Sequence, residues 1–447
     1  MPRHSVAALI EALATRIREG HLPPGTQLPT HRQLAARHGL ALASASKIYA
    51  RLGEMGLVIG ETGRGTFVRD HARQRDWDSS DEARLNASAL DLSFNHPDHP
   101  EQAALLRAML RELAAAGDPA SLLRQPPPGG RMRERASVSA FLAQARNIEA
   151  SPERIFLVNG AQQGLYIAAA ALLAPHDRLA ADALTYPGLR MLAAAQHLEV
   201  MPIPSLPDGP DLATLDRLCR QHRVGMIHAM PTLHNPLGWV LSHTQRLQLV
   251  DIARRHDCWL LEDAAYAYLE ARPPPALASL APERTIHVSS LSKSLASGLR
   301  FGFMVVPDRC ATRIRATIRA ACWSLPGIVS AMAVRWLDSG TVLRQETDLR
   351  NEWSKRQALA RNILDGMDMT AHPAAPFLWL RLPEGLRMDR IATALATRNI
   401  AVSKAEAYAT THHAPHALRL ALASMPFEKL GPALSEVRAT IEAFPPQ

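Results

Sequence analysis

Apolar residues recur at helical spacing in three consecutive segments near the start of the chain. A first helix is predicted over residues 5–19, because Gly20 follows its last apolar position. A second opens near Leu28, and a third runs from about Ala41 to Met55. The apolar stripes of the first and third helices are Val6, Leu9, Ile10, Leu13 and Ile17, and Leu42, Ala45, Ile48, Tyr49 and Leu52.

Polar and glycine positions mark the ends of these elements. Thr30 and Gln33 have the spacing of a capping box, which places a helix start at the second segment. After the third helix, residues 57–60 and 66–68 are short apolar runs on either side of a glycine-rich tip, which predicts two strands. Three helices with a tight turn between the second and third, followed by such a hairpin, form a winged helix-turn-helix.

A different pattern fills the remainder of the chain. Residues 71–89 show little periodicity and are rich in Arg, Asp and Ser, so we predict a flexible connector. From Leu90 onward, short apolar runs alternate with helical segments, which indicates an α/β domain with a mostly parallel sheet. The predicted strands are 155–158, 224–228, 259–261 and 285–288, and the clearest helices are 162–173 and 244–256.

Composition adds limits to this picture. With 447 residues, 47% of them hydrophobic and 21% charged, the chain is typical of a globular protein of about three domains. It has no long uncharged apolar stretch and no leader pattern at its start, so we expect a cytoplasmic protein. The four cysteines never form a C-x-x-C pair, which argues against a disulfide framework or a metal site. A net charge of +8 is compatible with DNA but is weak evidence over this length.

The run around Lys293 carries the clearest chemistry. Its ε-amine can form a Schiff base with an aldehyde, and small hydroxyl residues bracket it. Ser290, Ser292 and Arg300 can supply donors to a phosphate on the same molecule. This segment therefore predicts a site for a phosphorylated aldehyde.

Further polar residues follow the predicted strands, where ligands bind in parallel sheets. Residues 159–164 follow one strand and open a helix, whose free N–H groups suit a phosphate. Asn235 follows the next strand and can donate to a phenolate oxygen. Asp263 ends an apolar strand at the edge of the sheet, where its charge needs a partner such as a protonated pyridine nitrogen.

The N-terminal segment resembles the winged helix-turn-helix of the GntR regulators. Four ordered pieces carry the resemblance: Pro24-Gly25, Leu28 to Ala35, Tyr49 to Gly56 and Gly63 to Val68. The resemblance implies a DNA-binding domain over residues 1–70 whose third helix enters the major groove. Ala41-Leu42 stands where that family usually has Ser-Arg. The expected DNA contacts are Arg32, Ser44, Ser46, Lys47 and Arg64.

Residues 90–447 resemble the fold-type I aminotransferases of class I/II, with a small subdomain from about residue 330. The resemblance implies pyridoxal 5′-phosphate bound as an aldimine on Lys293. In that family pattern, Asp263 pairs with the protonated nitrogen of the pyridine ring, and Tyr186 stacks on the face of the ring. Arg419 is the residue that would pair with the carboxylate of the substrate. Tyr266 joins Asn235 at the phenolate, and the implied phosphate ligands are Ala161, Gln162, Ser290, Ser292 and Arg300.

Some positions depart from that family's pattern. Gln125 stands where a tyrosine commonly reaches the neighbouring subunit's cofactor, and Asn95-His96-Pro97 replaces a Gly-x-Pro in the loop that covers the substrate. Asn95 is accordingly a candidate effector contact. Leu184 replaces a proline before Tyr186.

The two resemblances together match the MocR subfamily of bacterial transcription regulators. They imply a head-to-tail homodimer that binds operator DNA on the nucleoid and senses pyridoxal phosphate or an amine, such as an amino acid, through Lys293. One alternative is a working aminotransferase with an appended winged-helix domain. Another is an N-terminal domain that binds protein instead of DNA, which predicts no salt-sensitive DNA binding.

Overall fold

The computed structural model describes residues 6–18, 21–22, 26–61, 65–68, 90–95, 101–115, 120–411 and 414–444. The predicted connector 71–89 lies outside these ranges, as do the motif residues Pro24, Gly25 and Gly63 and the candidate DNA contact Arg64.

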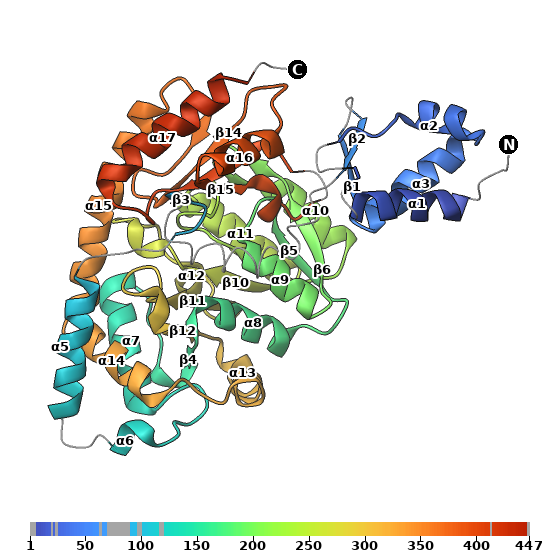
Figure 1. The fold of residues 1–447 in the computed structure, drawn as a ribbon. Helices are drawn as coiled ribbons and strands as arrows, with labels where there is room; N and C mark the ends of the chain where they lie inside the picture. Colours follow the sequence, from blue (N-terminus) through green and yellow to red (C-terminus); the bar gives the residue numbers. More distant parts are fainter. Residues whose placement is uncertain are drawn as a thin grey trace.

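The N-terminal part is a winged helix-turn-helix, as predicted (Figure 1). The buried side chains of its three helices form one apolar cluster that also includes residues of the hairpin. The elements are α1 (Val6–Arg18), α2 (His31–His38), α3 (Leu42–Glu54) and the antiparallel strands β1 (Val58–Glu61) and β2 (Gly65–Val68).

Local sequence signals set the ends of these helices. Thr30 and Gln33 form the predicted capping box at the start of α2. Gly39 ends α2 with a φ of 62°, a left-handed conformation that glycine adopts without strain. Leu42 was assigned to the apolar stripe of α3, and this is wrong: its side chain is 50% exposed. It lies in the first turn of the helix, beyond the part that packs on α1 and α2.

The large domain is built on a seven-stranded sheet in the order β4-β12-β11-β10-β9-β5-β6. Strand β12 is antiparallel to both of its neighbours, and the other pairs are parallel. The four strands expected from apolar runs are all present. The strands are β4 (Ile155–Val158), β5 (Arg178–Asp182), β6 (Glu199–Ile203), β9 (Val224–Ala229), β10 (Trp259–Asp263), β11 (Thr285–Ser290) and β12 (Gly302–Val305).

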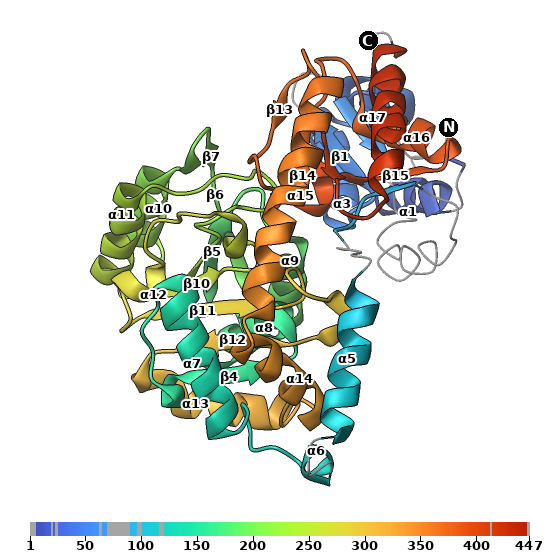
Figure 2. The same cartoon turned by 90° about the vertical axis from the view of Figure 1, so that its left-hand side faces the viewer.

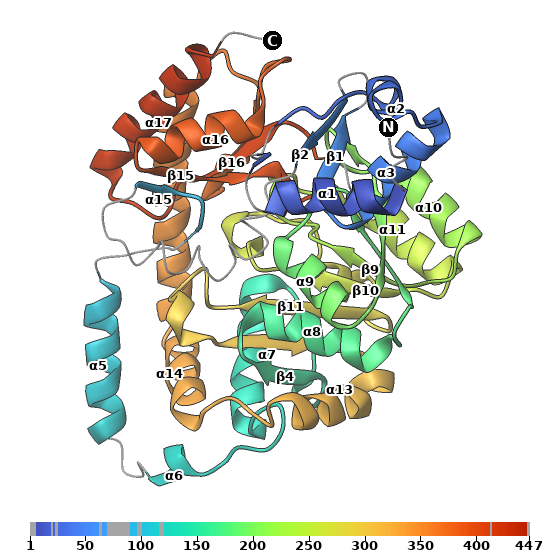
Figure 3. The same cartoon turned by 45° about the vertical axis from the view of Figure 1, so that its right-hand side comes forward.

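Helices cover both faces of this sheet. On one face α8, α9 and α13 pack against alternate strand residues, and α7, α10, α11 and α12 pack on the other (Figure 3). Among the described residues no helix is both long and apolar enough to span a membrane. The helices are α5 (Gln102–Ala115), α6 (Ala120–Leu123), α7 (Met132–Arg146), α8 (Gly160–Leu172), α9 (Pro187–Ala195), α10 (Leu212–Gln221), α11 (His243–Arg255), α12 (Leu277–Leu280), α13 (Asp308–Ala321) and α14 (Gly327–Asp338).

The small domain has its own five-stranded sheet, in the order β13-β14-β16-β15-β3. The long helix α15 leads into it from α14 of the large domain (Figure 2). Strand β3 (Leu90–Leu92) precedes the whole large domain in sequence, yet it pairs in parallel with β15. The other elements are α15 (Thr341–Ile363), β13 (Met369–Thr370), β14 (Phe377–Arg381), α16 (Met388–Thr397), β15 (Ile400–Lys404), β16 (Ala417–Ala421) and α17 (Phe427–Glu442).

Helix α8 lies unusually close to the sheet because of Gly164. A Cβ atom at this position would lie 2.6 Å from Cγ1 of Val288 in β11. The absence of a side chain therefore sets the distance between α8 and the sheet, and with it the position of the N-terminus of α8.

We expect Gly164→Ala to destabilise the protein by about 1–3 kcal/mol, because the new methyl group overpacks a closed core. Gly431→Ala is the matched control. It is also a helical glycine, in α17, but a Cβ there would find its nearest neighbour at 3.7 Å. We expect this control to be neutral or to stabilise by about 0.5–1 kcal/mol. Urea unfolding followed by circular dichroism measures both, and equal midpoints for the two variants would contradict this account of the packing.

Candidate functional site

The predicted cofactor residues gather where neighbouring strands of the large sheet end. Gly160 and the start of α8 follow β4, Asn235 lies in the loop after β9, and Asp263 is the last residue of β10. Lys293 lies in the loop after β11, and Arg300 lies two residues before the start of β12. These strands lie side by side in the sheet, so residues that are far apart in sequence meet at one edge.

The candidate phosphate-binding residues lie around the N-terminus of α8. Nη2 of Arg300 donates to the carbonyl oxygen of Asn159 at 3.2 Å and covers this helix end. Gly160 has a φ of +80°, which other residues rarely adopt, and a Cβ there would lie 3.0 Å from the same nitrogen, so this position favours glycine. Ser290 and Ser292 are buried beside them, and Oγ of Ser292 has no hydrogen-bond partner. A free helix N-terminus, an arginine and an unpaired hydroxyl suit a phosphate group.

Ala161 and Gln162 form the first turn of that helix. The side-chain nitrogen of Gln162 donates to the carbonyl oxygen of Gly188 at 2.9 Å, whereas its Oε1 is buried without a partner.

Tyr186, Asn235 and Asp263 surround the position expected for an aromatic ring. Tyr186 is the N-cap of α9, and burial raises the pKa of its hydroxyl, with a further contribution from the negative charge of Asp263 nearby. Oδ1 of Asn235 is buried and has no hydrogen-bond partner. An orphaned polar atom is costly in a protein interior, and a ligand that pairs with the asparagine side chain would remove this cost.

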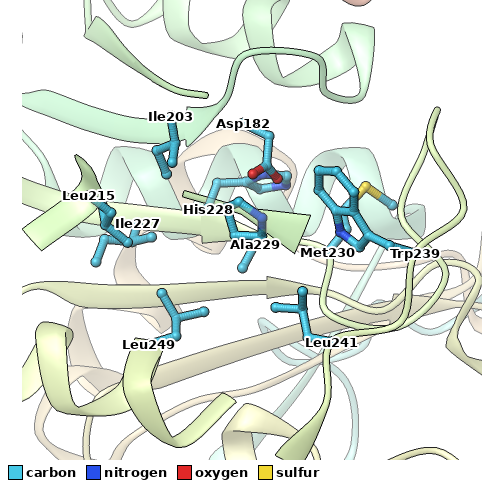
Figure 4. Close-up of a pocket in the computed structure, with 11 residues that line it drawn as sticks. Asp182, Ile203, Leu215, Ile227, His228, Ala229, Met230, Trp239, Leu241 and Leu249 are labelled. Carbon is cyan, nitrogen blue, oxygen red and sulfur yellow. The ribbon is translucent and has the colours of Figure 1, made fainter. Parts of the chain in front are cut away.

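Asp263 is a buried carboxylate, only 2% exposed. Its Oδ1 accepts a hydrogen bond from the backbone N–H of Ala265 at 2.9 Å, and its Oδ2 lies 3.9 Å from Nε2 of His228. Both ring nitrogens of His228 lack a hydrogen-bond partner. Figure 4 shows His228 beside Asp182 at a small pocket in the large domain. A buried charge with so few partners favours a cationic ligand, such as a protonated ring nitrogen.

The loop of Asn235 is held by a pair of buried side chains behind it. Nε2 of His234 lies 3.2 Å from Oδ2 of Asp182 at the end of β5. The other ring nitrogen, Nδ1, accepts from the backbone N–H of Leu237 at 3.3 Å, and the ring stacks on Trp239 at 4.0 Å. These contacts fix His234 and therefore the direction of the adjacent Asn235.

The amine of Lys293 points to the segment that follows β3. Nζ donates to the backbone carbonyl oxygen of Asn95 at 2.9 Å and lies 4.7 Å from the centre of the Phe94 ring. On the other side, the hydroxyl of Tyr268 donates to the carbonyl oxygen of Lys293 at 2.5 Å. The lysine backbone is thus held firmly while its amine lies against residues of the small-domain sheet edge.

Arg419 lies in the middle of β16 and is 3% exposed. Its Nη1 donates to the carbonyl oxygen of Ser93 at 3.4 Å, and its guanidinium lies 4.6 Å from the ring centre of Phe377. With the amide of Asn95 in its better orientation, Asn95 Oδ1 accepts from Arg419, and its nitrogen donates to the carbonyl oxygen of Pro376 at 2.8 Å. Nε of Arg419 has no partner, which leaves a donor for an anionic group.

Tyr266 also belongs to this cluster. Its hydroxyl lies 3.2 Å from the side chain of Asn95. Burial raises the pKa of this hydroxyl, and the positive charge of Arg419 only partly offsets the effect. The neutral phenol can therefore donate a hydrogen bond at this position.

Glu262, which directly precedes Asp263, is a second buried acidic residue. Burial alone would raise the pKa of Glu262, but His287 at 2.9 Å and the backbone N–H groups of Leu277 and Ala278 hold it below its usual value. Glu262 is fully paired and belongs to the framework of the site.

The residues present fit pyridoxal phosphate. Asn235, Ser292 and Arg419 each have a buried polar atom without a partner, and Asp263 is a buried carboxylate. They correspond in type to the phenolate, phosphate, carboxylate and pyridinium contacts that such a ligand and its amine partner require. The arrangement can hold an amine-reactive aldehyde on one side and an anionic substituent on the other.

The candidate DNA contacts lie on the outer side of the helix-turn-helix. Arg32 on α2 is exposed, as are Ser46 and Lys47 on α3, and Ser44 is half-buried. The spacing of the α3 residues directs them away from the apolar cluster formed by Ala45, Ile48 and Leu52.

Sequence reasoning missed several residues of the site. Phe94 and Tyr268 contact Lys293, and His228 and His234 support Asp263 and Asn235. His234 and Phe94 had a local signal, because they directly precede the candidates Asn235 and Asn95. His228 and Tyr268 are placed by long-range packing.

Comparison with known proteins agrees with both halves of this description. Residues 87–437 match the family described as Aminotransferase class I and II, and residues 6–68 match Bacterial regulatory proteins, gntR family. The chain is 29% identical over 405 residues to the HTH-type transcriptional regulator YdeF of Bacillus subtilis, covering 89% of this chain and 86% of that one. It is 26% identical to the pyridoxine biosynthesis regulator PdxR of Corynebacterium glutamicum, covering 90% and 88% of the two chains.

Solved structures agree on the fold. An archaeal alanine:glyoxylate aminotransferase superposes with a TM-score of 0.76 at 21% identity, covering 89% of this chain and all of the other. The chain therefore belongs to the class I and II aminotransferase family and carries an N-terminal gntR-type helix-turn-helix, the combination of the MocR- and PdxR-type transcription regulators.

Proposed function

We propose that this protein is a pyridoxal-phosphate-dependent transcription regulator that responds to a primary amine carrying a carboxylate. The observation that carries the proposal is the placement of two groups. The amine of Lys293 and Nη1 of the buried Arg419 each donate to a carbonyl oxygen of the same segment, residues 93–95, and Nε of Arg419 has no hydrogen-bond partner. An amino acid has both groups needed to use this pair.

When bound, pyridoxal phosphate supplies an aldehyde carbon that bonds reversibly to a primary amine. Arg419 would orient the incoming amino acid through its carboxylate, so that the nitrogen points toward Lys293. Nζ of Lys293 would hold the cofactor covalently and would be exchanged for an incoming primary amine, taking up the two protons that the incoming nitrogen loses, without oxidant or water. The result is a free Lys293 amine, without any requirement for turnover.

In the same proposal, the protein forms a head-to-tail homodimer that binds operator DNA in the bacterial cytoplasm. Supporting the dimer, α5, α6 and α14 lie together and expose Leu106, Leu110, Leu123 and Ile328. Leu123 is 90% exposed, and exposed apolar residues on adjoining helices are typical of an interaction surface. A second copy of the chain would cover this apolar face.

The first prediction concerns Lys293. In Lys293→Ala the covalent link to pyridoxal phosphate is lost, so the absorbance band near the visible edge disappears and borohydride no longer fixes the cofactor to the chain. Lys355→Ala is the control, because Lys355 is an exposed lysine on α15. Absorbance and intact mass give the result. A Lys293→Ala protein that still carried covalent cofactor would refute the assignment.

A second prediction concerns Arg419. Wild type should bind L-alanine more tightly than ethylamine, and Arg419→Ala should lose this preference by about 10- to 100-fold, because charged hydrogen bonds to the carboxylate disappear. Absorbance titrations of the cofactor-loaded protein measure both affinities. Arg381→Ala removes an exposed arginine of the same small domain and should retain the preference. An unaltered ratio in Arg419→Ala would place the carboxylate elsewhere.

The third prediction tests DNA binding. Lys47→Ala should weaken binding to a duplex from upstream of the protein's own gene and lower the slope of log Kd against log salt by about 1, because one phosphate contact is lost. Fluorescence anisotropy at several salt concentrations gives this slope. Lys355→Ala should leave it unchanged. If wild type showed no salt-sensitive binding to any duplex, the regulator proposal would fail.

A further inference from the structure

The segment of residues 90–95 joins the amine site to the rest of the small domain. It consists of β3 and the turn that follows, and it enters the sheet directly after the connector predicted from the sequence. Each residue of the turn is held by a different partner. The carbonyl oxygen of Ser93 accepts from Ser403 at 2.8 Å, that of Phe94 accepts from Ser424, and that of Asn95 accepts from Lys293 at 2.9 Å.

The turn therefore contacts both groups that an amino acid would use. Nζ of Lys293 faces the Asn95 carbonyl oxygen and the ring of Phe94, and the guanidinium of Arg419 contacts the Ser93 carbonyl oxygen and the Asn95 side chain. An ammonium group over an aromatic face and a carbonyl oxygen is well stabilised, whereas a lysine bonded to the cofactor cannot keep the same position. These contacts depend on whether the Lys293 amine is free.

On its other side the segment is paired with β15. Leu90, Asp91 and Leu92 lie opposite Ile400, Ala401 and Val402. The next residue of β15, Ser403, is the donor to Ser93 described above. A displacement of the turn would therefore move β15 as well, because backbone pairing and a side-chain hydrogen bond join the two.

From β15 a chain of charged contacts reaches the winged helix. Nζ of Lys404 lies 2.9 Å from Oδ1 of Asp389, and the other oxygen of Asp389 lies 3.7 Å from Nη2 of Arg387. The guanidinium of Arg387 in turn lies 4.0 Å from the ring centre of Phe67, in strand β2 of the wing. This contact joins the small domain to the DNA-binding domain.

We infer that the 90–95 segment reports the state of Lys293 to the wing, through β15 and the stacking of Arg387 on Phe67. The inference rests on the proposed function, because it names how an amine at that site would regulate DNA binding. Phe94 and Arg387 are positioning residues in it: neither is required for bonding to the cofactor or for contact with DNA. A free Lys293 amine stabilises one position of the segment, and a bonded one does not.

The experiment compares full-length protein loaded with pyridoxal phosphate before and after treatment with methoxyamine. The nitrogen of methoxyamine bonds to the cofactor aldehyde carbon as the bond to Lys293 breaks, and its two protons pass to Nζ, so the lysine is freed whatever the natural effector. Absorbance confirms the exchange. The readout is the ratio of the DNA dissociation constants before and after treatment, measured by anisotropy; such couplings typically amount to about 5- to 150-fold.

The variants are Phe94→Leu, which removes the aromatic face, and Arg387→Ala, which removes the stack on the wing. We expect each to reduce the methoxyamine-dependent ratio at least threefold, and the double variant to reduce it no further than the stronger single one, because both lie on one route. Phe427→Leu and Arg381→Ala, an exposed aromatic and an exposed arginine of the same domain, should retain the wild-type ratio. Melting temperatures verify that all variants are folded.

The outcomes separate this inference from the proposed function. A wild-type ratio that persists in both Phe94→Leu and Arg387→Ala would overturn the inference and leave the regulator proposal standing. A wild-type protein whose DNA affinity ignores methoxyamine, although absorbance shows the exchange, would overturn both.

Discussion

Asp263 and Arg419 are both almost completely buried, and the cost of removing charges from water governs the architecture around them. Each must find partners in the interior. Asp263 has a backbone N–H and a distant histidine, and Arg419 has a carbonyl oxygen, an aromatic ring and an asparagine. Neither group of partners is complete: both ring nitrogens of His228, and Nε of Arg419, have no hydrogen-bond partner. Such an interior is stable only where the rest of the fold is rigid, and it favours ligands that complete the missing contacts.

That rigidity comes from the large sheet and from α8. The sheet carries apolar clusters on both faces, and Gly164 allows α8 to approach β11 closely enough to place its N-terminus at the site. The small domain is joined differently. Its β3 contributes only three residues at the edge of the sheet, paired with a single neighbour. Edge strands of this length are held by few hydrogen bonds. The free energy needed to shift this segment is therefore small enough for the binding of a ligand to offset it.

Much of the fold follows from local patterns in the sequence. Apolar runs predicted β4, β9, β10 and β11, and Thr30 with Gln33 predicted the start of α2, because these signals act within a few residues. The clustering of Lys293, Asp263 and Asn235 followed from the rule that parallel strands end at one edge. Leu42 was misplaced because apolar spacing does not tell where a short helix leaves its neighbours.

The contacts of residues 90–95 had no such signal. Pairing of Leu90 with Ile400 joins residues separated by most of the chain, and three residues are too few to show a strand period. The same holds for Arg387 and Phe67, which carry no local mark of their contact.

The placement of these contacts also bears on why an aminotransferase fold would serve a regulator. In an enzyme, binding energy that moves a segment over the substrate is useful only if it lowers the barrier of the reaction. Here the segment that contacts Lys293 pairs with β15, and the small domain contacts Phe67 of the wing through Arg387, so the same movement can be transmitted to DNA. Linkage then requires that DNA change the affinity for the amine by the factor by which the amine changes the affinity for DNA. A lysine that is released and recaptured without turnover satisfies this reciprocity, because every step is an equilibrium. A committed catalytic step would break it.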